Sequence, residues 1–228
     1  MKLLNNERHQ RFKGELYGEF ARVGHALSNA KRLELLDLLA QRESSVEDLA
    51  EALGLSIASA SQHLQVLKAA KLVEVRREGT YAYYRLGNKE VYALVESLRN
   101  LTQQRLSEVE VILERYVGKR EFREEVTGAE LLRRVKAGKV TLIDVRPEAE
   151  YEAGHLPGAR SVPLEELEHR LKTLPKNREV VAYCRGRYCI FADEAVAFLK
   201  SKGYKAWRIA QSPVDWELAG LPVERKAA

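Results

Sequence analysis

The sequence contains little of what stabilises a small secreted protein or anchors a chain in a membrane. Only two of its 228 residues are cysteine, and both lie within residues 184–189. Two cysteines cannot form a disulfide framework, so a disulfide-rich domain is excluded and local cysteine chemistry is expected. The longest apolar runs, such as residues 180–183, are far shorter than the roughly 20 residues of a membrane span, and residues 1–12 are too polar for a secretory signal. We therefore expect a cytoplasmic protein without membrane segments.

Proline is absent from the first 118 residues, and all six prolines lie beyond residue 120. The first part is mainly helical by its apolar spacing, whereas the second part alternates β-rich runs with helical stretches. The β-rich runs are residues 140–145, 180–183 and 206–209, and the helical stretches are residues 128–137, 164–171 and 192–203. Such alternation predicts an α/β fold with a parallel sheet. We predict two domains, residues 1–118 and residues 119–228.

Composition and net charge leave the function open. The chain is 45% hydrophobic and 31% charged, which is typical of a globular protein and excludes a disordered or fibrous one. Its net charge is +5; the first 118 residues hold 17 basic and 16 acidic residues, and the remainder holds 21 and 17. Because neither half is strongly basic, only local patches can identify a nucleic-acid interface.

The middle of the first domain has the pattern of two helices joined by a tight turn. Ser45 precedes a helix that ends at Gly54, and Ser56 opens a second helix in which every third or fourth residue is apolar. This arrangement fits a helix-turn-helix. The second helix presents hydroxyl and amide side chains that can approach phosphates and base edges. Its predicted DNA contacts are Ser56, Ser59, Ser61, Gln62, His63, Gln65 and Lys68.

A β-hairpin is predicted next, at residues 72–86 with its turn at residues 77–80. Arg76, Arg77 and Arg85 lie near its ends and supply local positive charge. A helix in the major groove flanked by a basic hairpin over the phosphates is a coherent surface for double-stranded operator DNA. The alternative is a plain pair of helices with a solvated polar face.

Residues 17–86 resemble the ArsR/SmtB family of winged-helix repressors, chiefly through residues 20–36, 61–68 and 79–86. The resemblance implies transcriptional control by a homodimer, with residues 56–68 as the recognition helix. Apolar stripes on the flanking helices favour dimerisation independently, because these helices have little of their own domain to bury against. The stripes are Phe12, Leu16, Phe20, Val23 and Leu27, and then Val91, Leu94, Leu98, Leu101, Val109, Ile112 and Tyr116.

The sequence departs from the metal sensors of that family. Those proteins use cysteines on the helix before the recognition helix, or Asp, His and Glu on the last helix. Here residues 45–53 contain no cysteine, and residues 91–116 contain no histidine or aspartate. A tetrahedral nitrogen and sulfur site therefore has no ligands, and we predict no metal and no cofactor.

In the second domain a predicted strand runs directly into Cys184, followed by a short loop and a helix. Ligands of open α/β sheets bind at the carboxyl ends of strands, and the N–H groups of such a loop form an anion cradle. Because Arg185 and Arg187 add positive charge, we predict that Cys184 is held as a thiolate near neutral pH. The alternative is a buried structural cysteine.

Through motifs at residues 144–159, 183–185 and 216–223, residues 127–223 resemble a single-domain rhodanese. The resemblance implies that Cys184 takes a sulfane sulfur from a donor and holds it as a persulfide, and that Asp144, Arg146, Glu150 and His155 build the scaffold. The motifs that carry it are Asp144-Val-Arg146, Glu150-Tyr151, Gly154-His-Leu-Pro-Gly-Ala159, Tyr183-Cys-Arg185 and Trp216-Glu-Leu-Ala-Gly-Leu-Pro-Val223. The backbone amides implied to stabilise the persulfide belong to Arg185, Gly186, Arg187, Tyr188 and Cys189.

The sequence leaves two questions about residues 184–189 undecided. Arg187 and Cys189 stand where a common rhodanese loop has glycine and a basic or hydroxyl residue, which disfavours thiosulfate as the donor. A tight loop can also bring the two sulfurs close enough for one to attack a persulfide on the other. Alternatively, Cys189 is a small apolar filler at the start of the next helix.

The hypothesis that best joins the two halves is a transcriptional regulator whose rhodanese-like domain senses or transfers reactive sulfur. One alternative is a sulfurtransferase enzyme whose N-terminal half serves mainly for dimerisation. Another is an interaction protein with an inactive rhodanese-like domain.

Overall fold

The structure is a computed structural model that describes residues 2–117 and 126–226. It consists of two compact units, residues 1–98 and residues 99–228. The domain boundary that we predict after residue 118 falls outside the described residues. In the two described ranges, no helix combines the length and the apolarity that a membrane span requires.

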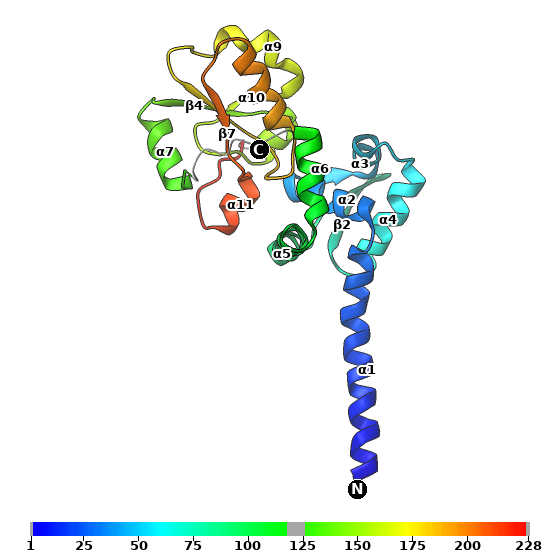
Figure 1. Cartoon of the computed structure of the whole chain (residues 1–228). Helices are drawn as coiled ribbons and strands as arrows, with labels where there is room; N and C mark the ends of the chain where they lie inside the picture. Colours follow the sequence, from blue (N-terminus) through cyan, green and yellow to red (C-terminus); the bar gives the residue numbers. More distant parts are fainter. Residues whose placement is uncertain (1, 118–125, 227–228) are drawn as a thin grey trace. The chain divides into compact units, whose positions relative to one another are not determined.

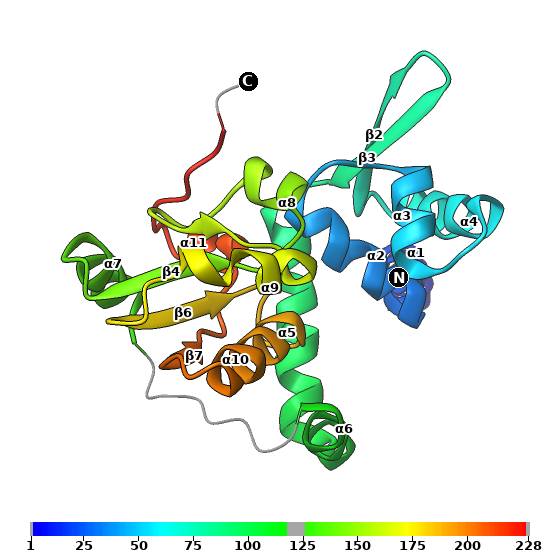
Figure 2. The same cartoon turned by 90° about the horizontal axis from the view of Figure 1, so that it is seen from above.

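The first unit contains helices and a small antiparallel sheet with strand order β1-β3-β2. Strands β2 and β3 form the predicted hairpin, which projects beyond the neighbouring helices in Figure 2. The long helix α1 extends away from the body of its unit (Figure 1). The elements are α1 (Lys2–Leu27), α2 (Ala30–Gln41), β1 (Ser44–Ser45), α3 (Val46–Leu53), α4 (Ile57–Ala69), β2 (Val73–Glu78), β3 (Tyr81–Leu86) and the first part of α5 (Lys89–Arg105).

Local sequence signals set the helix ends of the first unit. Asn29, Ser45 and Ser56 each accept a backbone N–H from the first turn of the helix that follows. Gly54 ends α3 with a φ of 61°, a left-handed conformation that glycine adopts without strain. The predicted helix-turn-helix is therefore confirmed. Ile57 begins the predicted apolar face of the second helix, but it is 55% exposed instead of buried, because it lies at the first position of α4.

The apolar stripes of the first unit and of helices α5 and α6 (Ser107–Val117) divide between core and surface. Val23 and Leu27 pack against the core of the first unit, and Val91 is buried in it, so these residues serve the core. The rest of the α1 stripe lies on the surface. The large exposed apolar side chains of these helices are Phe12, Leu16, Tyr17, Phe20, Leu94, Leu101, Val111, Ile112 and Tyr116.

The second unit is built on a four-stranded parallel sheet with strand order β5-β4-β6-β7, which confirms the predicted α/β fold. Strand β5 and the short helices α8 and α11 were not predicted. Besides the end of α5 and α6, the elements are α7 (Gly128–Lys136), β4 (Val140–Asp144), α8 (Glu148–Ala153), β5 (Arg160–Ser161), α9 (Leu167–Arg170), β6 (Glu179–Tyr183), α10 (Phe191–Ser201), β7 (Ala206–Arg208) and α11 (Pro213–Leu218).

The sheet is buried on both faces. Along β4, Ile143 packs into the core that holds residues of α10, whereas Leu142 packs into the core with Leu131 of α7 and Trp216 of α11. Every residue of β4 is buried, as expected for a central parallel strand. Because the strands are parallel, β4 and β6 end at the same edge of the sheet, and Cys184 follows directly after β6.

Candidate functional site

The polar face of α4 is open to solvent in part. Its apolar face is firmly buried, since Ala60, Leu64 and Leu67 are fully enclosed in the core. The helix therefore has a fixed rotation about its own axis, which determines the side chains that it presents. Of the predicted DNA contacts, Ser56, Gln62, Gln65 and Lys68 are exposed, and Ser59, Ser61 and His63 are half-buried.

Two of these side chains are already engaged within the protein. The Ser56 hydroxyl accepts the backbone N–H of Ser59 at 3.2 Å, so it caps the helix. The Gln65 amide donates to the Tyr84 hydroxyl at 3.1 Å and ties α4 to β3. Burial raises the pKa of Tyr84, which therefore stays neutral. Gln62 is exposed on the same helix.

The three predicted arginines of the hairpin have different surroundings. Arg76 pairs with Glu78 at 2.7 Å and with Glu43 at 3.2 Å. Arg85 pairs with Glu74 at 2.7 Å. Arg77 is exposed and makes no ion pair within the part of the chain that the structure describes. Its charge is thus the one most available to a phosphate.

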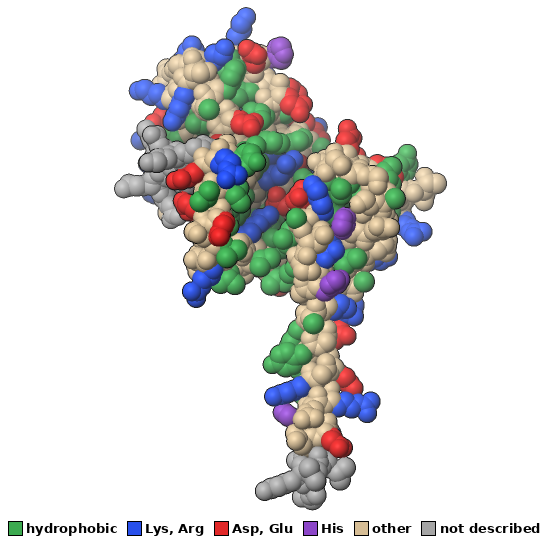
Figure 3. All heavy atoms as spheres, turned by 45° about the vertical axis from the view of Figure 1, so that its right-hand side comes forward, with side chains coloured by type: hydrophobic (Ala, Val, Ile, Leu, Met, Phe, Trp, Pro, Cys, Tyr) green, Lys and Arg blue, Asp and Glu red, His purple; other side chains and the backbone are tan. Residues whose placement is uncertain are grey.

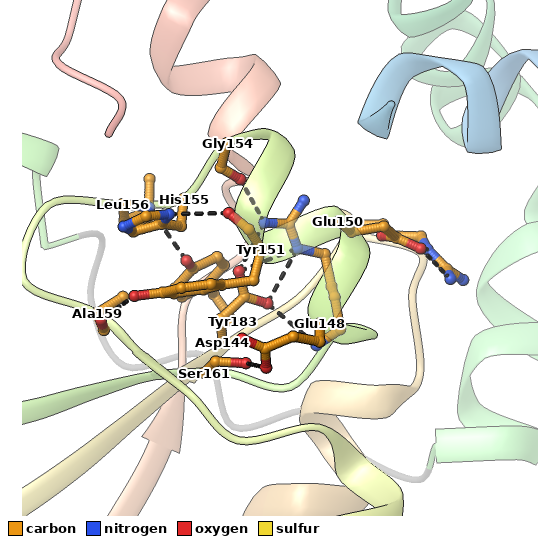
Figure 4. A network of polar contacts seen from close by, with 12 residues as sticks. Asp144, Glu148, Glu150, Tyr151, Gly154, His155, Leu156, Ala159, Ser161 and Tyr183 are labelled. Atoms are coloured by element: carbon orange, nitrogen blue, oxygen red, sulfur yellow. Dashed lines mark hydrogen bonds and ion pairs between the residues drawn. The ribbon is translucent and has the colours of Figure 1, made fainter. Parts of the chain in front are cut away.

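In the second unit a buried ion pair closes the end of β4 (Figure 4). Asp144 and Arg146 are 0% and 1% exposed, and the Arg146 Nη2 lies 2.6 Å from the Asp144 Oδ2. The same guanidinium donates to the Gly154 carbonyl at 2.7 Å. Although burial lowers the pKa of Arg146, the hydrogen bonds and charge of Asp144 outweigh it and raise the pKa overall. This ion pair links the end of β4 to the loop after α8, which indicates a structural role.

Three aromatic side chains, those of Tyr151, His155 and Tyr183, pack around the Asp144–Arg146 ion pair and stabilise the same region. The rings of Tyr151 and His155 stack with centroids 3.8 Å apart, and the Tyr151 hydroxyl donates to the Ala159 carbonyl at 3.0 Å. The hydroxyl of Tyr183 accepts the Leu156 N–H at 3.0 Å, and burial raises its pKa. Figure 4 shows these residues around the end of β4, and their contacts organise the loop between α8 and β5.

Arg185 is engaged as a structural cation. Its Nη2 lies 2.6 Å from the Glu150 Oε1, and Nε contacts both carboxylate oxygens at 3.0 and 3.1 Å. Glu150 is buried, so this pair joins α8 to the start of the loop at residues 184–189, which we call the cysteine loop. The carboxylate neutralises much of the charge that we predict to act on Cys184.

Cys184 itself is 1% exposed. Its thiol faces the carbonyl oxygens of Cys189 at 3.6 Å and Gly186 at 4.0 Å, which are acceptors and favour the protonated form. Burial raises the pKa of Cys184 well above its usual range. The prediction of a Cys184 thiolate near neutral pH is therefore wrong, because desolvation outweighs the nearby cations.

Cys189 has the environment that we predict for Cys184. It is half-buried, and the backbone N–H groups of Arg185 and Phe191 donate to its sulfur. The thiol of Cys184 donates to the same sulfur, and this hydrogen bond is the largest influence lowering the pKa of Cys189 to about 7. The two thiols therefore influence each other's pKa, and the Cys189 carbonyl lies 3.6 Å from the Cys184 Sγ.

Arg208 stabilises the cysteine loop by hydrogen bonds to its backbone carbonyls. The sequence analysis did not identify this residue. It is 6% exposed at the end of β7 and donates to the carbonyls of Gly186 at 2.9 Å and Cys189 at 3.1 Å. Asp193 of α10 pairs with it. Gly186 has a φ of +119°, which favours glycine and lets its carbonyl turn toward the guanidinium. A charged residue within a β-rich run was the available signal for Arg208.

The outer side of the cysteine loop meets the end of α5 within the second unit. The Tyr188 hydroxyl donates to the Gln103 Oε1 at 2.9 Å, and Arg187 Nη1 reaches the same oxygen at 3.4 Å. The guanidinium of Arg99 lies 5.7 Å from the centre of the Tyr188 ring. The predicted loop residues 184–189 therefore divide into an inner pair of thiols and an outer contact with a helix.

Comparisons with known proteins match the two units separately and together. Residues 127–219 match the rhodanese-like domain family, and residues 27–76 match a helix-turn-helix domain family. The chain is 46% identical over 215 residues to the HTH-type transcriptional regulator Rv0324 of Mycobacterium tuberculosis, covering 94% of each protein. The chain belongs to the ArsR family of transcriptional regulators. This regulator carries a C-terminal rhodanese-like domain.

Two further relatives of this ArsR-family regulator each match one unit. A sulfurtransferase of Allochromatium vinosum is 33% identical over 85 residues, which is 37% of this chain and 78% of that protein. A solved winged helix-turn-helix domain from Mycobacterium bovis, described as homodimeric and as a possible ArsR-family regulator, is 46% identical. It covers 41% of this chain and 87% of that one, with a TM-score of 0.39.

Proposed function

We propose that this regulator binds operator DNA as a homodimer and that its rhodanese-like unit takes up sulfane sulfur as a cysteine persulfide, which changes its affinity for the operator. The observation that carries the proposal is the pair of thiols in the cysteine loop, where the Cys184 Sγ lies 3.6 Å from the Cys189 carbonyl, in a chain whose other unit exposes a polar helix and a hairpin. One unit offers a surface for DNA and the other a reversible sulfur chemistry.

The proposed DNA binding is supported by side chains of the first unit that are exposed to solvent. Gln62 is exposed on α4, and Arg77 is exposed on the hairpin without an ion pair among the described residues. A glutamine that bonds a base edge gives sequence preference, and an arginine over the phosphates gives affinity that falls with salt. Both are expected of an operator-binding protein.

The proposed dimerisation is supported by the exposed apolar face of α1. Phe12, Tyr17 and Phe20 are 59%, 62% and 59% exposed, and hydrophobic side chains gather on one side of this helix in Figure 3. Such a surface is costly in water and is relieved by pairing with a second copy. The similar domain from Mycobacterium bovis is described as homodimeric. A twofold dimer predicts an operator with two inverted half-sites.

The proposed sulfur uptake is supported by the chemistry of thiols that lie in one short loop. A thiolate attacks a sulfane sulfur to form a persulfide, and a second thiol can then convert the persulfide to a disulfide. Both products are reversible in a reducing environment, as a signal requires. The resemblance to a sulfurtransferase supports the same assignment.

The test is operator binding with and without sulfur. An operator is first selected from randomised duplex DNA, and its affinity is then measured by fluorescence anisotropy for reduced and for polysulfide-treated protein. We expect a shift of about 1 to 3 kcal/mol in binding free energy, the usual size of coupling between two sites. The double variant Cys184→Ser, Cys189→Ser is the control and should show no shift.

Two results would overturn the proposal. If no sequence is enriched in the selection, the chain is not an operator-binding regulator. If the operator binds equally well to reduced and polysulfide-treated protein, the two units act independently, and the rhodanese-like unit is a sulfurtransferase tethered to DNA.

A further inference from the structure

The amino ends of the parallel strands in the second unit carry a row of cations, which we call the basic edge. We infer that the basic edge is a second contact with duplex DNA, made through the phosphates and independent of base sequence. The inference rests on the proposed function in so far as the partner is duplex DNA, and it goes beyond that function by giving the rhodanese-like unit a DNA contact of its own. The residues of the basic edge are Lys136, Lys139, Lys176, Arg178, Lys202 and Lys205.

One cation stands directly before each of three neighbouring strands. Lys139 precedes β4, Arg178 precedes β6 and Lys205 precedes β7. The three strands are parallel and adjacent in the order β4-β6-β7, and their first residues are paired to within one position. Since parallel strands that start in register begin at the same edge of a sheet, the three cations form a row across that edge.

The loops that carry these cations lie against one another. The Lys205 carbonyl accepts a backbone N–H from β6 at 2.8 Å, and the Lys176 Nζ donates to the Lys202 carbonyl at 3.4 Å. Gly138 forms the turn before β4, and a side chain at this position would begin 3.5 Å from the Arg178 Nη1. The basic edge is therefore one surface built from three loops.

The cations of the basic edge are open to water. Arg178 is half-buried, and the five lysines are exposed. The Nζ of Lys176 lies 5.1 Å from the centre of the Tyr204 ring, and the Nζ of Lys202 lies 5.2 Å from the centre of the Phe198 ring. These contacts limit the freedom of the ammonium groups without neutralising their charge.

Acidic residues are scarce at the basic edge. Among the described residues, the one ion pair that the six cations make joins Lys202 to Glu168 at 4.0 Å. Glu179 accepts the Trp207 Nε1–H at 3.2 Å, and Glu130 of α7 already pairs with two arginines of its own helix. A surface that is only solvated usually mixes both signs, so the excess of positive charge indicates an anionic partner.

The opposite edge of the same sheet contrasts with the basic edge. Three arginines there each pair with a carboxylate of the same unit, namely Arg146 with Asp144, Arg185 with Glu150 and Arg208 with Asp193. Those cations are internal supports of the structure. At the basic edge, by comparison, five cations have no ion pair within the described ranges, so their charge is available to a partner.

The ends of two helices account for only part of the basic edge. Helices α7 and α10 end at this edge, and cations near the end of a helix complement its dipole. That role explains Lys136 and Lys202, which are at the helix ends. It does not explain the three cations before the strands, because they stand outside both helices.

The spacing of the cations and the connection of the two units favour duplex DNA over an acidic protein. Neighbouring strands lie about 4.8 Å apart, so the row before three strands spans about 10 Å. Duplex DNA carries one negative charge per about 1.7 Å of its axis, so several phosphates can face such a row. Because both units belong to one chain, DNA bound by the first unit is at high local concentration for the second.

The experiment measures DNA affinity of the full chain by fluorescence anisotropy over a range of salt concentrations, on the selected operator and on a scrambled duplex of equal length. The triple variant Lys139→Gln, Arg178→Gln, Lys205→Gln removes the cations before the strands. We expect the slope of log affinity against log salt to fall by about 2 to 3 on both duplexes, and the affinity at about 0.1 M salt to fall at least about tenfold. The ratio of the two affinities should not change, because phosphate contacts carry no sequence information.

A matched control removes three positive charges from other parts of the same unit. In the variant Arg170→Gln, Arg225→Gln, Lys226→Gln, each lost cation is one that pairs with a carboxylate in wild type. Its net charge equals that of the first triple variant, and it should bind both duplexes with the wild-type slope. Tryptophan fluorescence during urea unfolding checks that the variants are folded, since Trp207 lies in β7. If the first triple variant does not fold, Lys139→Gln, Lys205→Gln at two exposed positions repeats the test, with an expected fall in slope of about 2.

Two outcomes would overturn the inference. Equal slopes in wild type and the folded variant would show that the basic edge does not contact DNA and would leave an acidic protein as its partner. An equal loss in the control would show that net charge alone causes the effect. Operator recognition is tested by a different readout, the enrichment of a sequence, whereas the salt slope on the scrambled duplex tests the basic edge, so either proposal can fail without the other.

Discussion

The two units place their functional groups in opposite ways. The first unit presents Gln62 and Arg77 on the outside of a helix and a hairpin, whereas the second unit encloses Cys184 and Arg208 at the edge of a buried sheet. An exposed group acts with its ordinary chemistry, because water surrounds it. An enclosed group has the pKa and reactivity that its neighbours impose, so its chemistry follows from contacts.

Ion pairs show the same contrast. The Arg85–Glu74 pair of the hairpin is more than half exposed on both sides, so water and salt screen it. The Arg146–Asp144 pair is buried, and loss of one partner would leave a charge without compensation. The first kind of pair tunes a binding surface, and the second kind holds the site together.

The largest expected effect tests whether the two units unfold independently of each other. Asp144→Asn should lower the unfolding free energy of the second unit by about 3 to 5 kcal/mol, because the Arg146 charge stays buried without a carboxylate. Both tryptophans, Trp207 and Trp216, belong to this unit, so tryptophan fluorescence during urea unfolding reports it selectively.

The control for this variant is Glu166→Gln, which removes an exposed pair with Arg170 in the same unit. It should leave the urea midpoint unchanged within error. DNA binding by the Asp144→Asn chain should survive when the second unit unfolds. Simultaneous loss of both signals would contradict the separation.

The next effect tests base recognition by the exposed helix. Gln62→Ala should reduce the preference for the selected operator over a scrambled duplex by about 1 to 3 kcal/mol, because a bidentate contact to a base is lost. Competition anisotropy measures both affinities. Gln65→Ala is the matched control; it should weaken the two duplexes equally, since Gln65 is bound to Tyr84. An unchanged preference in Gln62→Ala would remove this residue from the interface.

A smaller effect tests the arginines of the hairpin against one another. Arg77→Ala should weaken all sequences alike and reduce the slope of log affinity against log salt by about 1, as one phosphate contact is lost. Titrations at several salt concentrations measure the slope. Arg85→Ala removes a cation already paired with Glu74 and should change the slope less. Equal changes in the two variants would show that the internal ion pair opens on DNA.

The smallest effect tests communication from the cysteine loop through α5, which runs from the first unit into the second. Gln103→Leu removes the acceptor of Tyr188 and should diminish the sulfur-dependent shift in operator affinity by about 0.5 to 1.5 kcal/mol, the net value of one hydrogen bond. Anisotropy of reduced and polysulfide-treated protein measures the shift. Gln104→Leu, one exposed position further along, is the control. A full shift in Gln103→Leu would show that the signal takes another route.

Much of the fold could be predicted from local signals in the sequence. Ser45, Gly54 and Ser56 act on neighbouring backbone groups, so the helix-turn-helix is specified within a dozen residues. The β-rich runs of the second unit are fully buried strands, and their composition alone marked them. The short helix α11 escaped prediction although Ser212 and Asp215 form a capping box, because the six-residue helix is shorter than the apolar periodicity needs.

The sequence located the cysteine loop, but the protonation state of Cys184 could not be predicted from it. The sequence by itself determined that two thiols follow a buried strand, that cations lie beside them and that a polar helix and basic hairpin precede them. Only the tertiary structure decided that Glu150 takes up Arg185, that Arg208 arrives from β7 to hold the carbonyls, and that Cys184 is the enclosed thiol. The physical reason is that a pKa depends on desolvation and on partners distant in the chain, and neither is encoded in the spacing of two cysteines.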